Sequence, residues 1–231
     1  MTTKALTIPD TTLGKKYVMA VSGIVLFGFV IGHMVGNLQV FLGPKAINHY
    51  SHFLHTTPSL LWGARAVLLL AILAHVSSAF ALVKRNADAR PVGYQVKKNI
   101  ATSYAARTMQ VTGPLVLLYI IYHLAHLTVG VTAGIGYEHM MPLDADGLPN
   151  VYHNLVSSFK VPWVVGVYVI AQVMLSFHLY HGAWSMFQSL GLNHRRYNET
   201  LRSVASAIGL GTCAGFLAVP IGIFFFGIGG N

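Results

Sequence analysis

Five long apolar stretches dominate the sequence and decide what the chain can fold into. They run over roughly 17–42, 62–84, 105–131, 161–190 and 203–228. A helix needs about 20 largely apolar residues to cross the hydrocarbon core of a bilayer, and it satisfies its backbone polar groups internally. Residues 1–231 are therefore predicted to form a single all-α membrane domain, a bundle of five transmembrane helices.

The composition agrees with a multi-pass membrane protein, because 54% of the residues are hydrophobic and only 9% are charged. The net charge of +9 does not indicate a nucleic-acid partner, since the basic residues stand between the apolar stretches and form no continuous patch. The single cysteine, Cys213, excludes a disulfide framework, a cysteine zinc site and CxxCH attachment of c-type haem. The first stretch is too long for a signal-peptide core, so we expect it to be retained as a span.

The basic residues also predict the orientation. Of the 15 lysines and arginines, 12 lie at the N-terminus and in or beside the second and fourth connections. Such segments face the cytoplasm, which places the N-terminus inside and the C-terminus outside. In the third connection, the stretch VYHNLVSSF is typical of a short interfacial helix.

Glycines recur every fourth residue in the first stretch, at Gly28, Gly32 and Gly36. They form a ridge without side chains, which lets either a neighbouring helix or a flat ligand approach the backbone closely.

The sharpest feature is histidine inside the predicted spans. Six of the 12 histidines lie there: His33, His75, His123, His126, His178 and His181. An ionisable side chain at that depth is costly and should face the bundle interior with a partner. One such residue could equally be a packing residue, but six across four helices indicate a function.

The partner of these histidines is not predicted to be a carboxylate, because all six acidic residues lie in connections or near the termini. Di-iron bundles need Glu-x-x-His motifs and helical zinc hydrolases need HExxH, and neither motif is present. A flat, apolar ligand that accepts two neutral imidazoles from different helices fits better. Haem b has these properties.

Depth along the helices predicts two haems. His33 lies about 25 Å along its helix from Lys16, and His123 about 24 Å from Arg107, so both are near the outer face. His178 lies about 27 Å from the outer end of its own helix, which places it near the cytoplasmic face. His75 is near mid-span and pairs with His178 by elimination. Residues three apart differ little in direction, so depth does not separate His123 from His126, or His178 from His181.

Several motifs occur in order along the chain: GHMVGN (32–37), LLLAILAH (68–75), VTGP followed by YHLAH, and FHLYHGAWSMFQSLGLNHRRY (177–197). With them the chain resembles the five-helix, dihaem cytochrome b subunits of b558 type that anchor bacterial succinate dehydrogenases and fumarate reductases in the cytoplasmic membrane. The resemblance covers nearly the whole chain, and its last block is highly specific.

The resemblance implies the axial ligands. One histidine on each of the first four helices binds haem in that family, and the motifs place these at His33, His75, His123 and His178. The implied pairs are His33 with His123 and His75 with His178. His126 and His181 are then left with packing or proton-handling roles.

The resemblance also implies the function. A FAD flavoprotein and an iron-sulfur subunit would dock on the cytoplasmic face, and electrons would pass through two haems b to quinone, with menaquinone favoured. The chain would be the subunit of the enzyme complex that does not bind the dicarboxylate. Fumarate-reducing relatives carry a glutamate where this chain has Ser176, so the sequence favours succinate oxidation.

Further site residues are predicted at the two membrane faces. Cytoplasmic donors to the haem propionates are sought among Arg107, Gln188, Asn193 and His194. On the outer side the candidates are Trp62 and Arg65. In the first outer connection, His55 is a hypothesis for proton handling at the quinone site, and a solvated loop histidine is the alternative.

A different class of protein stays open, the histidine-rich membrane oxygenases and desaturases that bind two irons. Two HxxH pairs favour it, but its ligands should gather near one face, whereas these histidines occupy two depths. A packing or transport protein is the third reading, although the sequence has no convincing internal repeat.

Overall fold

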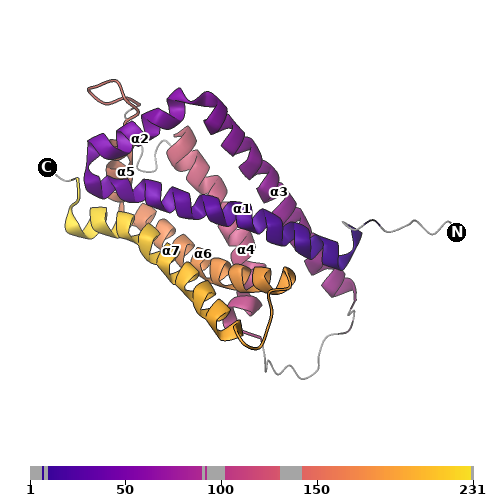
Figure 1. Ribbon diagram of the computed structural model, residues 1–231. Coiled ribbons are helices and arrows are strands. Elements are labelled where there is room, and N and C mark those ends of the chain that lie inside the picture. The colour runs from indigo at the N-terminus through magenta and orange to yellow at the C-terminus, as the bar shows by residue number, and fades with distance from the viewer. Residues whose placement is uncertain (1–6, 8–9, 90–91, 93–101, 131–141, 230–231) are drawn as a thin grey trace.

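The computed structural model describes residues 7, 10–89, 92, 102–130 and 142–229, and this part of the chain is helical (Figure 1). The elements are α1 (Thr12–Leu38), the 3₁₀ helix η2 (Gln39–Leu42), α2 (Pro44–Thr56), α3 (Pro58–Asp88), α4 (Tyr104–His123), the π-helix η3 (Leu124–Val129), α5 (Val151–Phe159), α6 (Pro162–Ser189) and α7 (Asn198–Phe226). Parts of the second and third connections lie outside the described residues.

Five helical segments of the described residues are long and apolar enough to cross a membrane: Thr12–Leu42, Pro58–Asp88, Tyr104–Val129, Pro162–Ser189 and Asn198–Phe226. The five predicted spans are confirmed as helices, and the protein is an all-α, multi-pass membrane protein by length and composition. Three helices, α1, α3 and α7, start four or five residues before the predicted spans, because polar and turn-forming residues begin them. Thr11 caps α1 by accepting the Gly14 N–H at 2.9 Å, and Pro58 is the first residue of α3.

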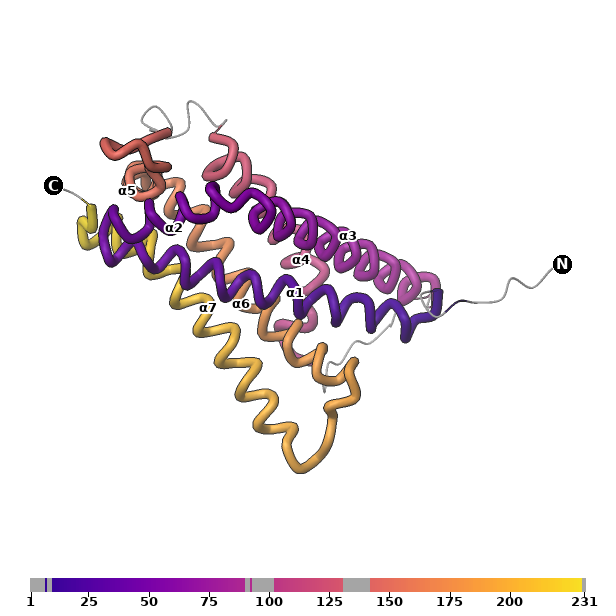
Figure 2. The backbone as a smooth tube through the Cα atoms, turned by 45° about the horizontal axis from the view of Figure 1, so that its top comes forward, coloured from indigo at the N-terminus to yellow at the C-terminus, as the bar shows by residue number. Residues whose placement is uncertain are grey.

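The helices pack in neighbouring pairs. α1 lies along α3, and α6 lies along α7 and also packs against α4 (Figure 2). α1 makes further contacts with α6 and α7. Within the described residues, α1 approaches α4, and α3 approaches α6, much less closely. Any contact between α1 and α4, or between α3 and α6, is therefore made by long side chains.

One end of the bundle carries a cap, which we define as α2, residues 142–150 and α5. It lies at the same end as the C-terminus (Figure 1). Val151–Phe159 is helical as predicted, whereas the first connection, predicted as a polar connection, contains the helix α2. Asn48 joins the parts of the cap, because its amide donates to Asp144 Oδ2 at 2.8 Å and accepts the Tyr152 N–H at 3.0 Å.

Asp144 organises the loop within the cap. Its carboxylate accepts the Leu148 N–H at 2.9 Å, which is the largest cause that lowers the pKa of Asp144 below its ordinary value. The Asn48 amide lowers this pKa further. The best-buried apolar core lies beside this loop, under the cap, and includes Val40, Phe159 and Ile223.

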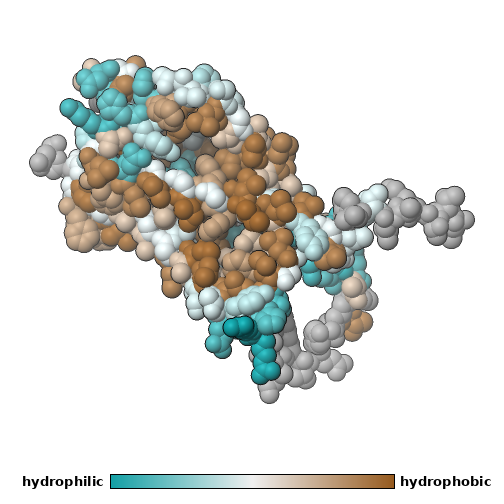
Figure 3. All heavy atoms as spheres, viewed as in Figure 1, coloured by the Kyte–Doolittle hydropathy of each residue, from teal (hydrophilic) through white to brown (hydrophobic). Residues whose placement is uncertain are grey.

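The face of the bundle seen in Figure 3 is largely apolar between its two ends. Large side chains such as Leu70 and Phe80 on α3, Leu118 on α4 and Leu210 on α7 are exposed. Polar residues gather instead at the cap and at the α6–α7 connection (Figure 3). An apolar belt between polar ends is the surface that a bilayer covers.

Candidate functional site

Histidines from different helices meet at two places in the bundle. The ring centroids of His33 on α1 and His123 on α4 are 5.7 Å apart, with an interplanar angle of 81°. Those of His75 on α3 and His178 on α6 are 6.2 Å apart, at 56°. These are the two pairs that the family resemblance implies, and they agree with the depths of the histidines along their helices. They join the helix pairs whose backbones approach each other less closely.

Within each pair, the distance between the two ring centroids suits one metal ion bound between the two imidazoles. Two metal–nitrogen bonds of about 2 Å each, plus the distance from each nitrogen to its ring centre, separate two ligating imidazoles by about 6 Å. In the described part of the chain, no group of three or more His, Cys, Asp or Glu side chains is placed to hold a metal ion. Two imidazoles without further protein ligands are a set of side chains that can hold a porphyrin iron.

The ring of His75 is oriented by the backbone of α1. Its Nδ1 lies 3.1 Å from the Met19 carbonyl oxygen and 3.4 Å from Ser22 Oγ. Because a carbonyl oxygen only accepts, Nδ1 carries the hydrogen, and the lone pair of the ring is on Nε2. A backbone carbonyl that fixes the tautomer in this way is usual behind a ligating histidine.

The ring of His123 is oriented by a side chain. Its Nδ1 lies 3.2 Å from Tyr168 Oη, and the same hydroxyl lies 2.7 Å from Nδ1 of His126. His126 is fully buried, whereas His33 and His123 keep part of their surface accessible. The structure thus separates the members of this pair: His123 faces His33, and His126 packs behind it against Tyr122 and Tyr168.

His178 has no comparable orienting group among the described residues. Its Nδ1 is buried and makes no hydrogen bond there. A Cβ added to Gly113 would lie 3.9 Å from its Cε1, so α4 passes close to the ring. A buried imidazole nitrogen without a hydrogen-bond partner is uncommon in a packing residue. This favours a role for His178 other than filling the core.

The predicted glycine ridge divides into two parts. A Cβ at Gly36 would lie 2.9 Å from the ring of Tyr50, so this glycine admits a side chain of the cap. Gly28 and Gly32 have no neighbouring atoms within 4 Å of an added Cβ. Close helix packing therefore does not explain Gly28 and Gly32, which leave room beside α1.

The predicted cytoplasmic contacts are not gathered at one point. Asn193 Oδ1 accepts a hydrogen bond from Asn198, and His194 Nδ1 accepts the Arg196 N–H at 3.2 Å, so both side chains organise the α6–α7 connection. Arg107 lies over the Tyr104 ring in the first turn of α4. Gln188 is exposed near the end of α6.

The predicted outer residues are exposed. Arg65 stacks over the Trp62 ring at 4.8 Å on α3. His55 lies in the last turn of α2, where its Nδ1 donates to the Ser51 carbonyl at 2.8 Å. Ser176 donates to the Gly209 carbonyl at 2.9 Å and so belongs to the α6–α7 contact.

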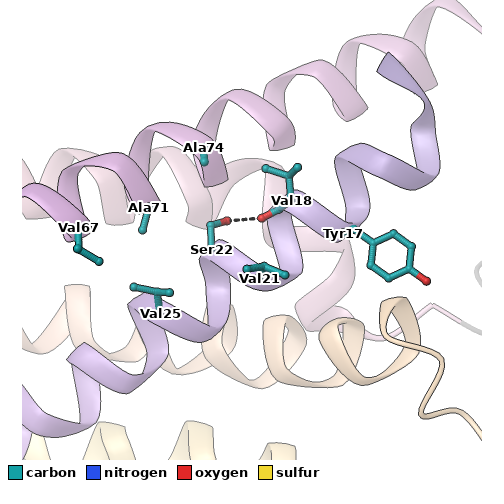
Figure 4. A pocket seen from close by; sticks show the side chains of 8 residues that line it. All are labelled: Tyr17, Val18, Val21, Ser22, Val25, Val67, Ala71 and Ala74. Atoms are coloured by element: carbon teal, nitrogen blue, oxygen red, sulfur yellow. Dashed lines mark hydrogen bonds between the residues drawn. The ribbon is translucent and has the colours of Figure 1, made fainter. Parts of the chain in front are cut away.

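An apolar groove of about 460 Å³ opens on the surface between α1 and α3 (Figure 4). Val25, Val67 and Ala74 line it, and Tyr17 marks one end. Ser22 is its polar member, and the hydroxyl donates to the Val18 carbonyl at 2.7 Å. Because Ser22 also approaches His75, the groove lies directly behind one histidine pair.

Sequence reasoning missed Tyr168 as a member of the site. A signal was present, because a tyrosine inside an apolar helix needs a hydrogen-bond partner for its hydroxyl. Its partners are on α4 and η3, more than 40 residues away, and only the crossing of α6 with α4 identifies them.

Comparison of the chain with protein-family models, with curated proteins and with solved structures found no match.

Proposed function

We propose that this chain is the cytochrome b membrane-anchor subunit of a succinate:quinone oxidoreductase, in which two haems b carry electrons from an iron-sulfur subunit to quinone, with menaquinone as the favoured acceptor. The observation that carries the proposal is the presence of two interhelical histidine pairs with centroid separations of 5.7 and 6.2 Å. Both pairs lie in the apolar parts of their helices, and the acidic residue that these helices contain, Asp88, is the last residue of α3 and pairs with Lys84 at 3.0 Å.

Each histidine pair would hold one of the two haems. His33 and His123 would hold the haem nearer the cap, and His75 and His178 the other. When bound, the haem irons supply one-electron oxidation and reduction. The Met19 carbonyl and the Tyr168 hydroxyl orient the rings of His75 and His123. The apolar helices would keep water away from bound haems, which would help to set their reduction potentials.

Basic residues support docking of the flavoprotein and the iron-sulfur subunit at the end of the bundle away from the cap. Lys16, Arg195, Arg196 and Arg202 are exposed near the start of α1 and around the α6–α7 connection. By the positive-inside rule this end faces the cytoplasm of a bacterial cell, with the cap on the outer side.

A di-iron oxygenase or desaturase is less well supported. Such a site holds each iron with several protein side chains, and no cluster of three or more suitable ligands occurs in the described residues. The two histidine pairs, on separate helices, suit two porphyrins better than one di-iron centre.

The haem content tests the proposal directly. The purified, dithionite-reduced protein is expected to show the visible spectrum of haem b, and a pyridine haemochrome assay should count two haems per chain. Non-haem iron in place of haem would instead support the oxygenase, and a protein without iron would exclude both.

His55→Ala tests the quinone site. If His55 handles protons for quinone, the variant should lose quinone turnover in the assembled complex while both haem spectra persist. His52→Ala, in the same helix, is the matched control and should keep its turnover. Equal turnover in the two variants would remove His55 from the site.

A further inference from the structure

A chain of three side chains lies behind one of the proposed haem ligands. Tyr168 Oη is 3.2 Å from Nδ1 of His123 and 2.7 Å from Nδ1 of His126. The phenol is almost completely buried, with 4% of its surface exposed. Phe159 and Tyr119 pack edge-on against its ring, with centroids 4.9 and 5.3 Å away. The hydroxyl is therefore held in one place between the two imidazoles.

The chemistry of three groups fixes the direction of the hydrogen bonds. If His123 binds iron through Nε2, its Nδ1 carries a hydrogen and donates it to the Tyr168 oxygen. The hydroxyl hydrogen of Tyr168 is then directed at Nδ1 of His126, which accepts it. His126 lies in the π-helix Leu124–Val129, directly after α4, and such widened turns are frequent at functional sites.

We propose that Tyr168 is a positioning residue that fixes the ring of His123 and sets the reduction potential of the haem held by His33 and His123, with His126 as the acceptor that orients the Tyr168 hydroxyl. The inference rests on the proposed function, because it requires haem at this pair. It gives His126 a role that the motifs leave open.

The second histidine pair lacks this arrangement. His75 is oriented by a backbone carbonyl, which no substitution of a side chain removes. The Nδ1 of His178 makes no hydrogen bond within the described residues. A single hydroxyl deletion at Tyr168 should therefore act on one haem and leave the other unchanged.

The sign of the effect follows from ligand basicity. A hydrogen-bond acceptor at Nδ1–H makes the imidazole a stronger electron donor, which favours the oxidised iron. Without the Tyr168 hydroxyl, His123 donates less, and the haem becomes easier to reduce. Loss of a group that orients a metal ligand typically costs about 10–100-fold in metal affinity or activity. A tenfold weaker hold on the oxidised iron relative to the reduced iron would raise the reduction potential by about 59 mV.

Tyr168→Phe and Tyr122→Phe form a matched pair of variants for this test. Both remove one hydroxyl from the same aromatic cluster, but the Tyr122 hydroxyl is buried without a hydrogen-bond partner in the described residues. Each full-length protein is purified, its haems are counted, and its haem potentials are measured by a redox titration followed in the visible spectrum. His33→Ala identifies which of the two haem signals belongs to the pair His33 and His123.

The expected result is a more positive potential, or loss, of that one haem in Tyr168→Phe, with both haems unchanged in Tyr122→Phe. Equal behaviour of the two variants would overturn the role of Tyr168, as would a shift in the haem that His33→Ala retains. Failure of the proposed function is distinguishable, because the unaltered protein would then contain no haem b before any variant is compared.

Discussion

Replacing His178 with alanine is expected to halve the haem content of the purified protein, from two haems b per chain to one. The substitution removes one of the two imidazoles that face each other between α3 and α6, 6.2 Å apart. His75 alone would then hold the proposed haem through one imidazole, and the low-spin spectrum of a haem held by two histidines should disappear from that site. His33 and His123 lie on other helices, α1 and α4, so the haem proposed for that pair should remain.

His181→Ala is the matched control for this prediction. His181 lies three residues further along α6 and belongs to the same HxxH motif, but its ring makes no contact with His75 like that of His178. Both haems should persist in this variant. Loss of haem in His181→Ala and not in His178→Ala would reverse the assignment within the motif and would also contradict the pairing across α3 and α6.

The five long helices were predictable because the apolar sequence of each span is enough for it to form a helix in a membrane. A stretch such as 62–84 becomes a helix in a membrane whatever its neighbours do, since its backbone groups have no other partners. The confirmed helix Val151–Phe159 is a similarly local feature. The helix α2 was missed because polar residues such as Asn48 fill its sequence. Asn48 is buried only through its contacts with Asp144 and Tyr152, about 100 residues away.

For the site, the residues alone predicted only how deep each histidine lies along its helix. The rise along a helix predicts that His33 and His123 share a level, and the structure brings them together. Depth does not describe direction around a helix, so it left His123 and His126 equivalent. Their difference comes from Tyr168, which lies behind both and is positioned by the packing of α6 against α4. A side chain such as Tyr168, which orients a histidine of another helix, could not be predicted for the same reason.

Within the described residues, the most extensive helix contacts are those of α6 with α7 and of α1 with α3. The best-buried apolar residues lie under the cap, and α6 and α7 are in close contact at Gly209. The two helices that each histidine pair joins, α1 with α4 and α3 with α6, approach each other less closely and meet through these side chains. We infer that the cap and the α6–α7 contact hold the bundle together, so that the helices between them keep the separation that a flat cofactor needs.

Gly209→Leu is expected to destabilise the bundle strongly, because this glycine is the point where α7 touches the backbone of α6. A Cβ added there would lie 2.9 Å from the Ser176 carbonyl oxygen and 3.1 Å from Tyr180 Cβ. Neither atom can swing aside as the end of a flexible side chain does, so the helices must separate. Overpacking typically costs about 1–3 kcal/mol, and separation would also lengthen the 2.9 Å hydrogen bond from Ser176 to the Gly209 carbonyl.

Gly211→Leu is the control, since it makes the same chemical change two residues along the same helix. Gly211 is exposed, and an added Cβ there meets no atom within 4 Å. Its side chain would point toward lipid, where leucine is favourable, and the helix would gain about 1 kcal/mol in propensity over glycine. Two measurements are made in detergent: the temperature of thermal unfolding and the yield of monodisperse protein. Both should be lower for Gly209→Leu and unchanged for Gly211→Leu. Equal stability of the two variants would mean that α6 and α7 do not approach at Gly209, and the close α6–α7 contact would have to be abandoned.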